Sequence, residues 1–285
     1  MTVLEVIQRS TEFLAKKGVE PARLQTELLL AHVLKLPRMR LYLDFERSLS
    51  ASESDTVREL VKRRGRREPL QHIVGSTCFC GLELVVNRNV LIPRPETELL
   101  AEQGWEFLNV YPAHRPVTAL DLGTGSGCLA IALASKCPAA QIIATDSSAD
   151  ALTVARENAE RHGVADRITF RLGDGFASLT GADRLNLIIS NPPYIPTEEI
   201  ASLQPEVRDH DPRRALDGGL DGLDFFRRLA DEAPAFLEPH GKIMIEFGDG
   251  QAEVVRHIFE LQKWIVEAIQ SDYTHRPRIL LARRD

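Results

Sequence analysis

Residues 117–136, VTALDLGTGSGCLAIALASK, decide the fold of most of this 285-residue chain. An apolar run ends near Asp121, three glycines alternate over residues 123–127, and a second apolar run with helical spacing begins near Cys128. A strand, a glycine turn and a helix in this order place the N–H groups of a helix N-terminus at the carboxyl end of a strand. The stretch therefore predicts a ligand site at one edge of a parallel sheet.

The pattern continues to the end of the chain as short apolar segments separated by amphipathic ones. Strands are expected at 117–122, 141–146, 168–174, 185–190 and 242–248, and helices from about 128 and near 152–162 and 223–237. The segments 252–270 and 277–283 supply another helix and two late strands whose direction the sequence leaves open. Strands that alternate with helices predict an α/β fold, a doubly wound and mostly parallel sheet with helices on both faces.

The first 70 residues differ, because their apolar positions repeat at helical spacing with no strand pattern between them. We expect a small all-helical domain there. Its end is strongly basic, with six Lys and Arg residues within 58–67. Two interpretations of this run stay open: a solvated helix end before a linker, or a contact with ribosomal or transfer RNA.

A connector follows the helical segment. Residues 70–92 are rich in β-branched and aromatic side chains around Gly81, which predicts a hairpin or a pair of short strands. After it, Pro93 and Pro95 stiffen the chain before helical spacing over 96–109. The predicted parts are a helical domain over 1–72, a β-hairpin linker over 73–92 and the sheet domain over 93–285.

The composition, 44% hydrophobic and 27% charged, is that of an ordinary globular protein. The formal charge of −6 argues against nucleic-acid affinity carried by overall charge, because such binding needs Lys and Arg to displace counterions. No apolar run approaches the roughly 20 residues of a membrane span, and the N-terminus lacks a signal-peptide pattern, so we expect a cytoplasmic protein.

Cysteines at 78, 80, 128 and 137 lack metal-site spacing. We expect packed free thiols and no metal, with Cys78 and Cys80 on one face of a strand.

Two acidic residues follow the strands that come after the glycine turn. Asp146 ends the next strand, where an acid accepts hydrogen bonds from both hydroxyls of a ribose, and Asp174 follows the third, within reach of an adenine amino group. Simpler interpretations are glycines that only allow close packing, Asp146 as a helix cap and Asp174 as a solvated turn residue. The spacing of turn and acid favours a nucleotide-like ligand.

The fourth strand, 185–190, runs into the tetrapeptide NPPY at 191–194. Its two prolines remove N–H donors and leave carbonyl oxygens as acceptors, and Asn191 adds an amide oxygen. A planar group with an NH2 fits these acceptors, with Tyr194 covering its face, so the target is an amide or the exocyclic amine of a base. Acceptors and alignment make such a nitrogen reactive toward an electrophilic carbon without a strong base. The alternative is a proline turn that only ends the strand.

The motifs LDLGTGSG, ATD and SNPPYIP resemble those of S-adenosylmethionine-dependent methyltransferases that act on amide or amino nitrogen. The segments QHIVG, VLIPRPETE, RDHDPRRALDGGLDGLDFFRRL and IEFGDGQ are similar to the peptide chain release factor glutamine methyltransferases, the PrmC/HemK family. The resemblance covers essentially the whole chain. It implies a Rossmann-like class I methyltransferase fold, with residues 1–72 for substrate recognition and 93–285 for methyl transfer.

The resemblance implies transfer of a methyl group to N5 of the glutamine in the GGQ motif of class 1 release factors, in support of translation termination. S-adenosyl-L-methionine would be the cofactor and S-adenosyl-L-homocysteine the product. The release factor's GGQ loop would be the partner, and we expect a monomer that binds neither membranes nor, stably, nucleic acid.

The resemblance also assigns site residues by motif match. Cofactor binding would fall to Gly123, Thr124, Gly125, Ser126, Gly127, Asp146, Asp174, Gly175 and Asn191. The substrate amide would be bound by Asn191, Pro192, Pro193 and Tyr194, of which Asn191, Pro192 and Tyr194 are the expected catalytic residues, with Arg94 and Glu96 bordering the cleft or forming an ion pair at a helix start. Some members carry an aromatic residue where this chain has Gly175, so the group that stacks on adenine stays open, with Phe176 as one candidate.

Three other functions stay open. An adenine-N6 or guanine-N2 nucleic-acid methyltransferase uses the same kind of tetrapeptide, but it needs a basic, aromatic recognition region, for which only 58–67 qualifies. A non-catalytic module that holds a ribosomal partner would keep its role without Asn191. A nicotinamide oxidoreductase would bind NADH in place of S-adenosylmethionine.

Overall fold

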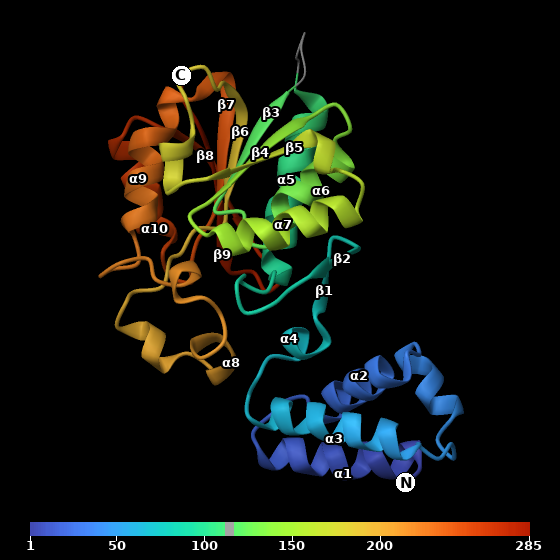
Figure 1. Cartoon of the computed structure of the whole chain (residues 1–285). Coiled ribbons are helices and arrows are strands. Elements are labelled where there is room, and N and C mark those ends of the chain that lie inside the picture. Colours follow the sequence, from blue (N-terminus) through green and yellow to red (C-terminus); the bar gives the residue numbers. More distant parts are fainter. Residues whose placement is uncertain (112–116) are drawn as a thin grey trace. The chain divides into compact units, whose positions relative to one another are not determined.

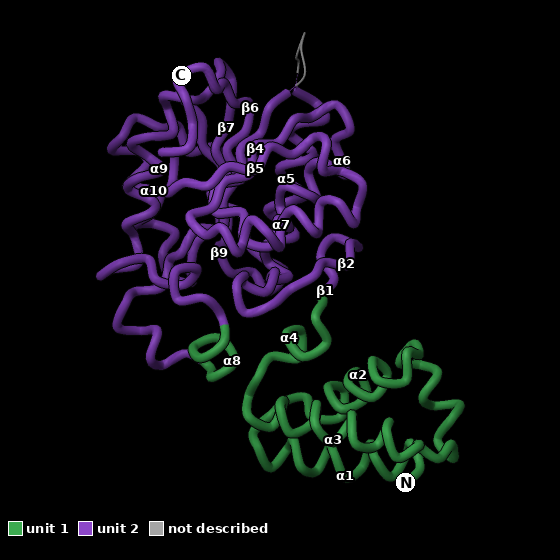
Figure 2. Tube along the Cα trace, viewed as in Figure 1, with its two compact units in different colours: residues 1–76, 204–210 green, residues 77–203, 211–285 purple. Residues whose placement is uncertain are grey.

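The computed structural model describes residues 1–111 and 117–285. They form two compact units, which we call the helical unit (residues 1–76 and 204–210) and the sheet unit (77–203 and 211–285) (Figure 2). Residues 204–210 therefore interrupt the sheet unit in sequence but pack with the helical unit. The domain boundaries predicted at residues 72 and 92 stay predictions.

The helical unit contains α1 (Val3–Lys16), α2 (Ala22–Leu34), a 3-10 helix (Arg38–Leu43), α3 (Ala51–Gly65) and the short α4 (Leu70–Val74) (Figure 1). α1 and α3 each begin at a capping box, in which Thr2 and Ser50 exchange hydrogen bonds with the glutamate three residues on. Apolar side chains at helical spacing, among them Leu14 and Leu29, are fully buried between the helices. The predicted helical N-terminal part is confirmed.

The basic run at the end of α3 is partly paired within the helical unit. Helix α8 (Pro205–Arg208) carries Glu206, whose carboxylate binds Arg64 Nη2 at 2.7 Å and Arg67 Nη2 at 2.6 Å. Burial opposes ionisation of Glu206, but hydrogen bonds from the two arginines prevail and lower its pKa to about 2. Arg64 and Arg67 therefore pair with a carboxylate within the helical unit, a contact that neither interpretation of the basic run included.

The hairpin is shorter than predicted. β1 (Ser76–Phe79) and β2 (Leu82–Val85) pair around a turn at Cys80 and Gly81. Residues 70–74 form α4 instead of a strand, and Gly75, with φ of 80°, ends that helix. Cys80 lies in the turn with φ of 50°, so the strand face that we expected it to share with Cys78 was wrong. All four cysteines are free, but Cys78 is exposed and not packed.

Apart from the hairpin strands β1 and β2, the described strands of the sheet unit form one seven-stranded sheet in the order β5-β4-β3-β6-β7-β9-β8 (Figure 1). Their bounds are β3 Thr118–Leu122, β4 Gln141–Asp146, β5 Ile168–Leu172, β6 Leu185–Ser190, β7 Leu237–Glu246, β8 Ile265–Ser271 and β9 Pro277–Arg283. The five strands from β5 to β7 are parallel, and β9 runs antiparallel to both β7 and β8. The predicted doubly wound, mostly parallel sheet is confirmed.

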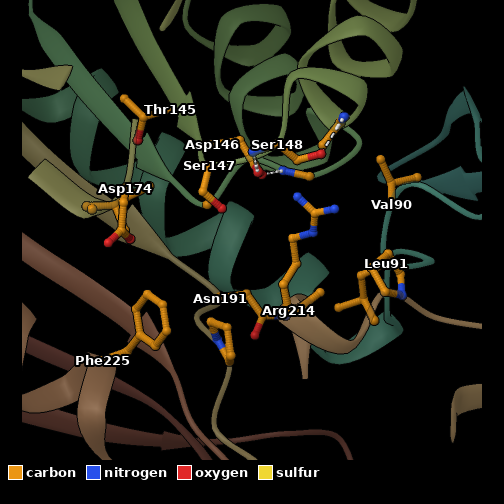
Figure 3. Close-up of a pocket in the computed structure, with 18 of the residues that line it drawn as sticks. Val90, Leu91, Thr145, Asp146, Ser147, Ser148, Asp174, Asn191, Arg214 and Phe225 are labelled. Carbon is orange, nitrogen blue, oxygen red and sulfur yellow. Dashed lines mark hydrogen bonds between the residues drawn. The ribbon is translucent and has the colours of Figure 1, made fainter. Parts of the chain in front are cut away.

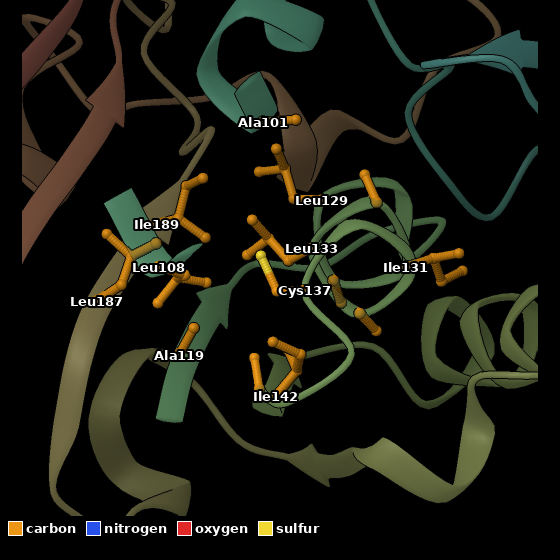
Figure 4. Packing of buried hydrophobic residues seen from close by; sticks show 14 of the residues in the cluster. Ala101, Leu108, Ala119, Leu129, Ile131, Leu133, Cys137, Ile142, Leu187 and Ile189 are labelled. Atoms are coloured by element: carbon orange, nitrogen blue, oxygen red, sulfur yellow. The ribbon is translucent and has the colours of Figure 1, made fainter. Parts of the chain in front are cut away.

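Helices pack on both faces of this sheet. On one face lie α5 (Pro95–Val110), α6 (Cys128–Lys136) and α7 (Ala149–Arg161), and on the other α9 (Asp224–Glu232) and α10 (Ala252–Leu261). Ala119 and Leu187 point into the first core, which Figure 4 shows, while their neighbours Leu120 and Ile188 point into the second. This alternation follows from the two-residue period of a strand.

Short 3-10 segments complete the described chain at Ala165–Arg167, Gly175–Ser178, Glu199–Ser202, Arg213–Ala215 and Ala233–Ala235. None of the helices described is both long and apolar enough to cross a bilayer. The strand order reverses at β3, which has β4 on one side and β6 on the other. At such a switch point, open α/β sheets bind ligands outside the carboxyl ends of the strands.

Gly104 lets α5 lie directly on α6 and β6. A Cβ at this position would be 2.9 Å from Leu133 Cδ2 and 3.0 Å from Ile189 Cδ1. We expect Gly104→Val to lower the free energy of unfolding by about 1–3 kcal/mol, because an overpacked core must shift. Urea denaturation measures the change. The control Gly181→Ala, where no described atom beyond the adjacent residues lies within 4 Å of the new Cβ, should stay within about 0.5 kcal/mol of the parent. Equal stability of Gly104→Val and the parent would contradict this packing.

Candidate active site

A pocket opens at the carboxyl ends of β3, β4 and β6, at the switch point of the sheet (Figure 3). The predicted site residues that line it are Gly123, Gly125, Asp146, Asp174, Gly175, Asn191 and Pro193. The others lie outside its lining: Thr124, Ser126, Gly127, Pro192, Tyr194, Arg94 and Glu96. Sequence reasoning did not single out several further lining residues, among them Val90, Leu91, Ser148, Arg214 and Phe225.

The glycine turn faces the pocket with bare backbone. Gly123 and Gly125 have φ of 79° and 55°, and beyond the adjacent residues no described atom lies within 4 Å of the point where a Cβ would stand. Gly127 has a different role, because a Cβ there would lie 3.1 Å from Ala155 Cβ in α7. The first two glycines therefore leave room for a ligand at the N-terminus of α6, and the third allows close helix packing.

Asp146 connects the two loops at this edge of the sheet. Its Oδ2 accepts a hydrogen bond from Gly125 N at 2.9 Å, and its Oδ1 accepts one from Ser148 N at 2.8 Å. The cap of α7 is Ser148, whose Oγ accepts from Ala151 N, so Asp146 is not needed as the helix cap. Its carboxylate is held at the pocket wall, where lone pairs remain for ligand hydroxyls.

Asp121 lies beneath the glycine turn and is fully buried. Its Oδ2 accepts from Thr124 Oγ1 at 2.6 Å and from Ala130 N at 3.0 Å. Its Oδ1 has no hydrogen-bond partner among the described residues. Burial raises the pKa of Asp121 to about 7, against the lowering effect of these two hydrogen bonds. A buried carboxyl with a free oxygen next to an open turn fits a site that binds a polar or cationic group.

Asp174 and Gly175 form the opposite wall. The Asp174 carboxylate binds Arg228 Nη1 at 2.9 Å through both oxygens, and Arg228 Nη2 donates to the Asp174 carbonyl oxygen. Gly175 has φ of 57°, and a Cβ there would clash with the guanidinium of Arg228. The arginine therefore occupies the space in which a larger side chain at position 175 would lie.

The aromatic side chain at this wall comes from another element. Phe176 is buried and stacks on Phe236, with ring centroids 5.4 Å apart and planes 5° from parallel, so it belongs to the core. Phe225, at the start of α9, lines the pocket near Asp174 (Figure 3). One sequence signal could have indicated Phe225, the aromatic pair at the N-terminus of an amphipathic helix, but such pairs are common in cores.

The tetrapeptide 191–194 leaves β6 toward the pocket. Asn191 Nδ2 donates to Thr97 Oγ1 at 3.0 Å, and Gln251 Nε2 donates to the Tyr194 carbonyl oxygen at 2.9 Å. No described residue donates to the carbonyl oxygens of Pro192 or Pro193. The tetrapeptide thus presents oxygen acceptors, and its hydrogen bonds with Thr97 and Gln251 hold it in place. We call residues 191–194 the acceptor corner. Burial raises the pKa of the Tyr194 hydroxyl, which stays a neutral donor.

Arg94 and Glu96 stand at the start of α5. Arg94 is the residue before the helix, and its Nη2 binds Asp211 Oδ2 at 2.6 Å. The partner of Arg94 is therefore a carboxylate 117 residues away, and this pair ties the PRPETE segment to the loop that follows the tetrapeptide. Arg94 thus forms an ion pair at the start of α5, as expected, but its partner is Asp211 and not Glu96.

A doubly wound sheet whose glycine turn, acidic strand ends and asparagine–proline corner meet in one pocket defines a Rossmann-like methyltransferase. Family models agree: the PrmC N-terminal domain matches residues 5–75, and the methyltransferase small domain matches residues 105–204. A crystal structure of a methyltransferase from Pyrococcus furiosus has the same fold, with a TM-score of 0.52 and 20% identity over 78% of this chain and 97% of that one.

Curated relatives give the particular family. The chain is 48% identical to a release factor glutamine methyltransferase from Geobacter sulfurreducens over 90% of this chain and 88% of the relative. It is 44% identical to a release factor glutamine methyltransferase from Chlorobaculum tepidum, over 89% of this chain and 88% of the relative. The chain therefore belongs to the release factor glutamine methyltransferase family.

The buried Asp121 makes stability depend on pH. Its pKa of about 7 exceeds the ordinary 3.8, so the folded chain holds a proton between about pH 4 and 7 that the unfolded chain has released. The carboxyl therefore destabilises the fold more as the pH rises through this range. We expect the stability of Asp121→Asn, relative to the parent, to increase by about 2–3 kcal/mol from pH 5 to pH 8. Denaturation of the ligand-free protein at both pH values measures it. A difference that does not change with pH would contradict the buried acid.

Proposed function

We propose that the chain transfers a methyl group from S-adenosyl-L-methionine to the side-chain nitrogen, N5, of the glutamine in the GGQ motif of class 1 release factors. The observation that carries the proposal is the acceptor corner: Asn191 and Pro193 line the same pocket as the glycine turn and Asp146. A substrate NH2 held by this corner would lie beside the ligand held by the turn.

The pocket suits the proposed cofactor. The open turn at Gly123 and Gly125 would take the methionine part, and Asp146 would accept hydrogen bonds from the ribose hydroxyls. Asp174 and Phe225 would bind the adenine by a hydrogen bond and by stacking. When bound, S-adenosylmethionine supplies an electrophilic methyl group on a sulfonium sulfur, which becomes a thioether after transfer.

The residues of the corner would activate a weak nucleophile by position. An amide nitrogen has two N–H bonds, and two acceptors, Asn191 Oδ1 and the Pro192 carbonyl oxygen, would hold both. This hydrogen bonding raises electron density on the nitrogen and aims it at the methyl carbon, an orientation effect of several kcal/mol. Tyr194 would pack beside the amide plane. The nitrogen loses one proton to water after methylation, so no strong base is required.

Methylation of a release factor tests the proposal. Mass spectrometry of a purified release factor, incubated with the chain and S-adenosylmethionine, should show one added methyl group on the GGQ glutamine. Asn191→Ala should lower the rate by about 100-fold or more, because the amide loses an acceptor in the transition state, while exposed Asn109→Ala should not. Labelled methyl found in tRNA, rRNA or DNA instead would establish the nucleic-acid alternative and overturn the proposal. Binding of NADH without binding of S-adenosylmethionine would also overturn it and favour an oxidoreductase.

The helical unit would recognise the release factor outside its GGQ loop. A groove between α1 and α3 has an apolar floor with Val6, Val57 and Val61, and basic residues Arg9, Arg58 and Lys62 line it too. Its charge suits an acidic face of the partner. An enzyme with this substrate would act as a monomer in the cytoplasm, where translation terminates.

Charge reversal in the groove separates recognition from chemistry. Lys62→Glu should lower kcat/KM for the intact release factor by about 3- to 10-fold, because a rim charge is worth about 1 kcal/mol, and should not change methylation of a short GGQ peptide. Lys35→Glu, which changes the net charge equally on the exposed end of α2, serves as control. If Lys62→Glu lowered kcat/KM equally for the short GGQ peptide and the intact release factor, recognition by this groove would be contradicted.

A further inference from the structure

Glu246, at the end of β7, joins the two polar side chains of the tetrapeptide. Only 2% of its surface is exposed. Its Oε2 accepts a hydrogen bond from Thr97 Oγ1 at 2.7 Å, and its Oε1 accepts one from the Tyr194 hydroxyl at 3.4 Å. Thr97 in turn accepts from Asn191 Nδ2 at 3.0 Å. One carboxylate therefore contacts Tyr194 directly and Asn191 through a single threonine.

We infer that Thr97 and Glu246 are positioning residues, which fix the Asn191 side chain so that its oxygen, and not its nitrogen, faces the substrate amide. This inference rests on the proposed function of Asn191. Neither Thr97 nor Glu246 lines the pocket, so both act through the residues that they hold.

The direction of the hydrogen bonds carries the argument. A threonine hydroxyl has one proton, and with Glu246 ionised Thr97 donates it to the carboxylate. Towards Asn191 it is then only an acceptor, so the amide must present its NH2 to Thr97 and its Oδ1 to the other side. If the Asn191 amide were flipped, its Oδ1 would face the Thr97 oxygen, so that an acceptor would face an acceptor. Its NH2 would then face the NH2 of the substrate, so that a donor would face a donor. Leaving polar groups unsatisfied in a site closed to water costs about 1–3 kcal/mol.

The surroundings of Glu246 support a role beyond the fold. Burial raises the pKa of Glu246 to about 7, with Glu96 nearby acting in the same direction and Arg278 opposing it. A buried acid of this kind costs stability near neutral pH, and such groups cluster at functional sites. The three residues that meet here come from the start of α5, the end of β6 and the end of β7. The packing of all three elements therefore holds the acceptor corner.

Two substitutions at Thr97 test the inference. Thr97→Val keeps the shape and removes the hydroxyl, while Thr97→Ser keeps the hydroxyl and removes a methyl group. We expect Thr97→Val to lower kcat for release-factor methylation by about 10- to 100-fold with the Kd for S-adenosylhomocysteine unchanged, because the amide loses its orientation. In Thr97→Ser, kcat should stay within about threefold of the value for the parent. Equal kcat values for the two variants would overturn the inference.

Glu246 has a matching pair. Glu246→Gln retains an oxygen that accepts from Thr97, so it should keep most of the activity, whereas Glu246→Leu should behave like Thr97→Val. Loss of activity in both Glu246 variants with normal activity in Thr97→Val would overturn the proposed chain of contacts.

A spectroscopic readout separates this inference from the proposed function. The side-chain NH2 resonance of Asn191, assigned by its absence in Asn191→Ala, should keep its position in Thr97→Ser and move in Thr97→Val. The measurement needs no turnover, so it stands even if the parent chain methylates no release factor. An identical Asn191 resonance in the parent and Thr97→Val would overturn the inference.

Discussion

The parallel pairing of β3 with β4 on one side and β6 on the other is the constraint on which the site depends. It brings the carboxyl ends of three strands together, and each end carries one part of the pocket: the glycine turn after β3, Asp146 at the end of β4 and Asn191 after β6. The helices on both faces hold this register through two apolar cores. A change that shifted β6 against β3 would separate the acceptor corner from the glycine turn.

The site adds polar groups that the fold alone would not favour. Asp121 beneath the turn and Glu246 beneath the corner are both buried, and both have a pKa raised to about 7 by that burial. Each costs stability and orients neighbouring groups in return: Asp121 holds Thr124 and the first turn of α6, while Glu246 holds Thr97 and Tyr194. The two buried acids support the two halves of the pocket, and a protein selected for stability alone would replace them.

The sequence predicted the sheet and the residues at the strand ends, because period, glycine turns and prolines are local signals. It placed the late strands without their direction, which depends on tertiary pairing of β9 with β7. It missed contacts between distant segments: Asp211 with Arg94, Glu206 with Arg64, and the Phe225 side chain at the pocket wall. Residues 70–74 were expected in a strand but form a helix, because a short run with Leu, Ile and Val is compatible with either structure. The left-handed backbone conformation of Gly75 ends this helix.

In the proposed complex, Asn191 and the Pro192 carbonyl oxygen hold the amide of the glutamine next to the methyl donor. A crystal structure of the chain with S-adenosylhomocysteine and a GGQ peptide tests it most directly. We expect the glutamine side-chain nitrogen within about 2.7–3.2 Å of Asn191 Oδ1 and of the Pro192 carbonyl oxygen. A glutamine amide bound elsewhere, or Asn191 with its nitrogen turned to the substrate, would contradict the account.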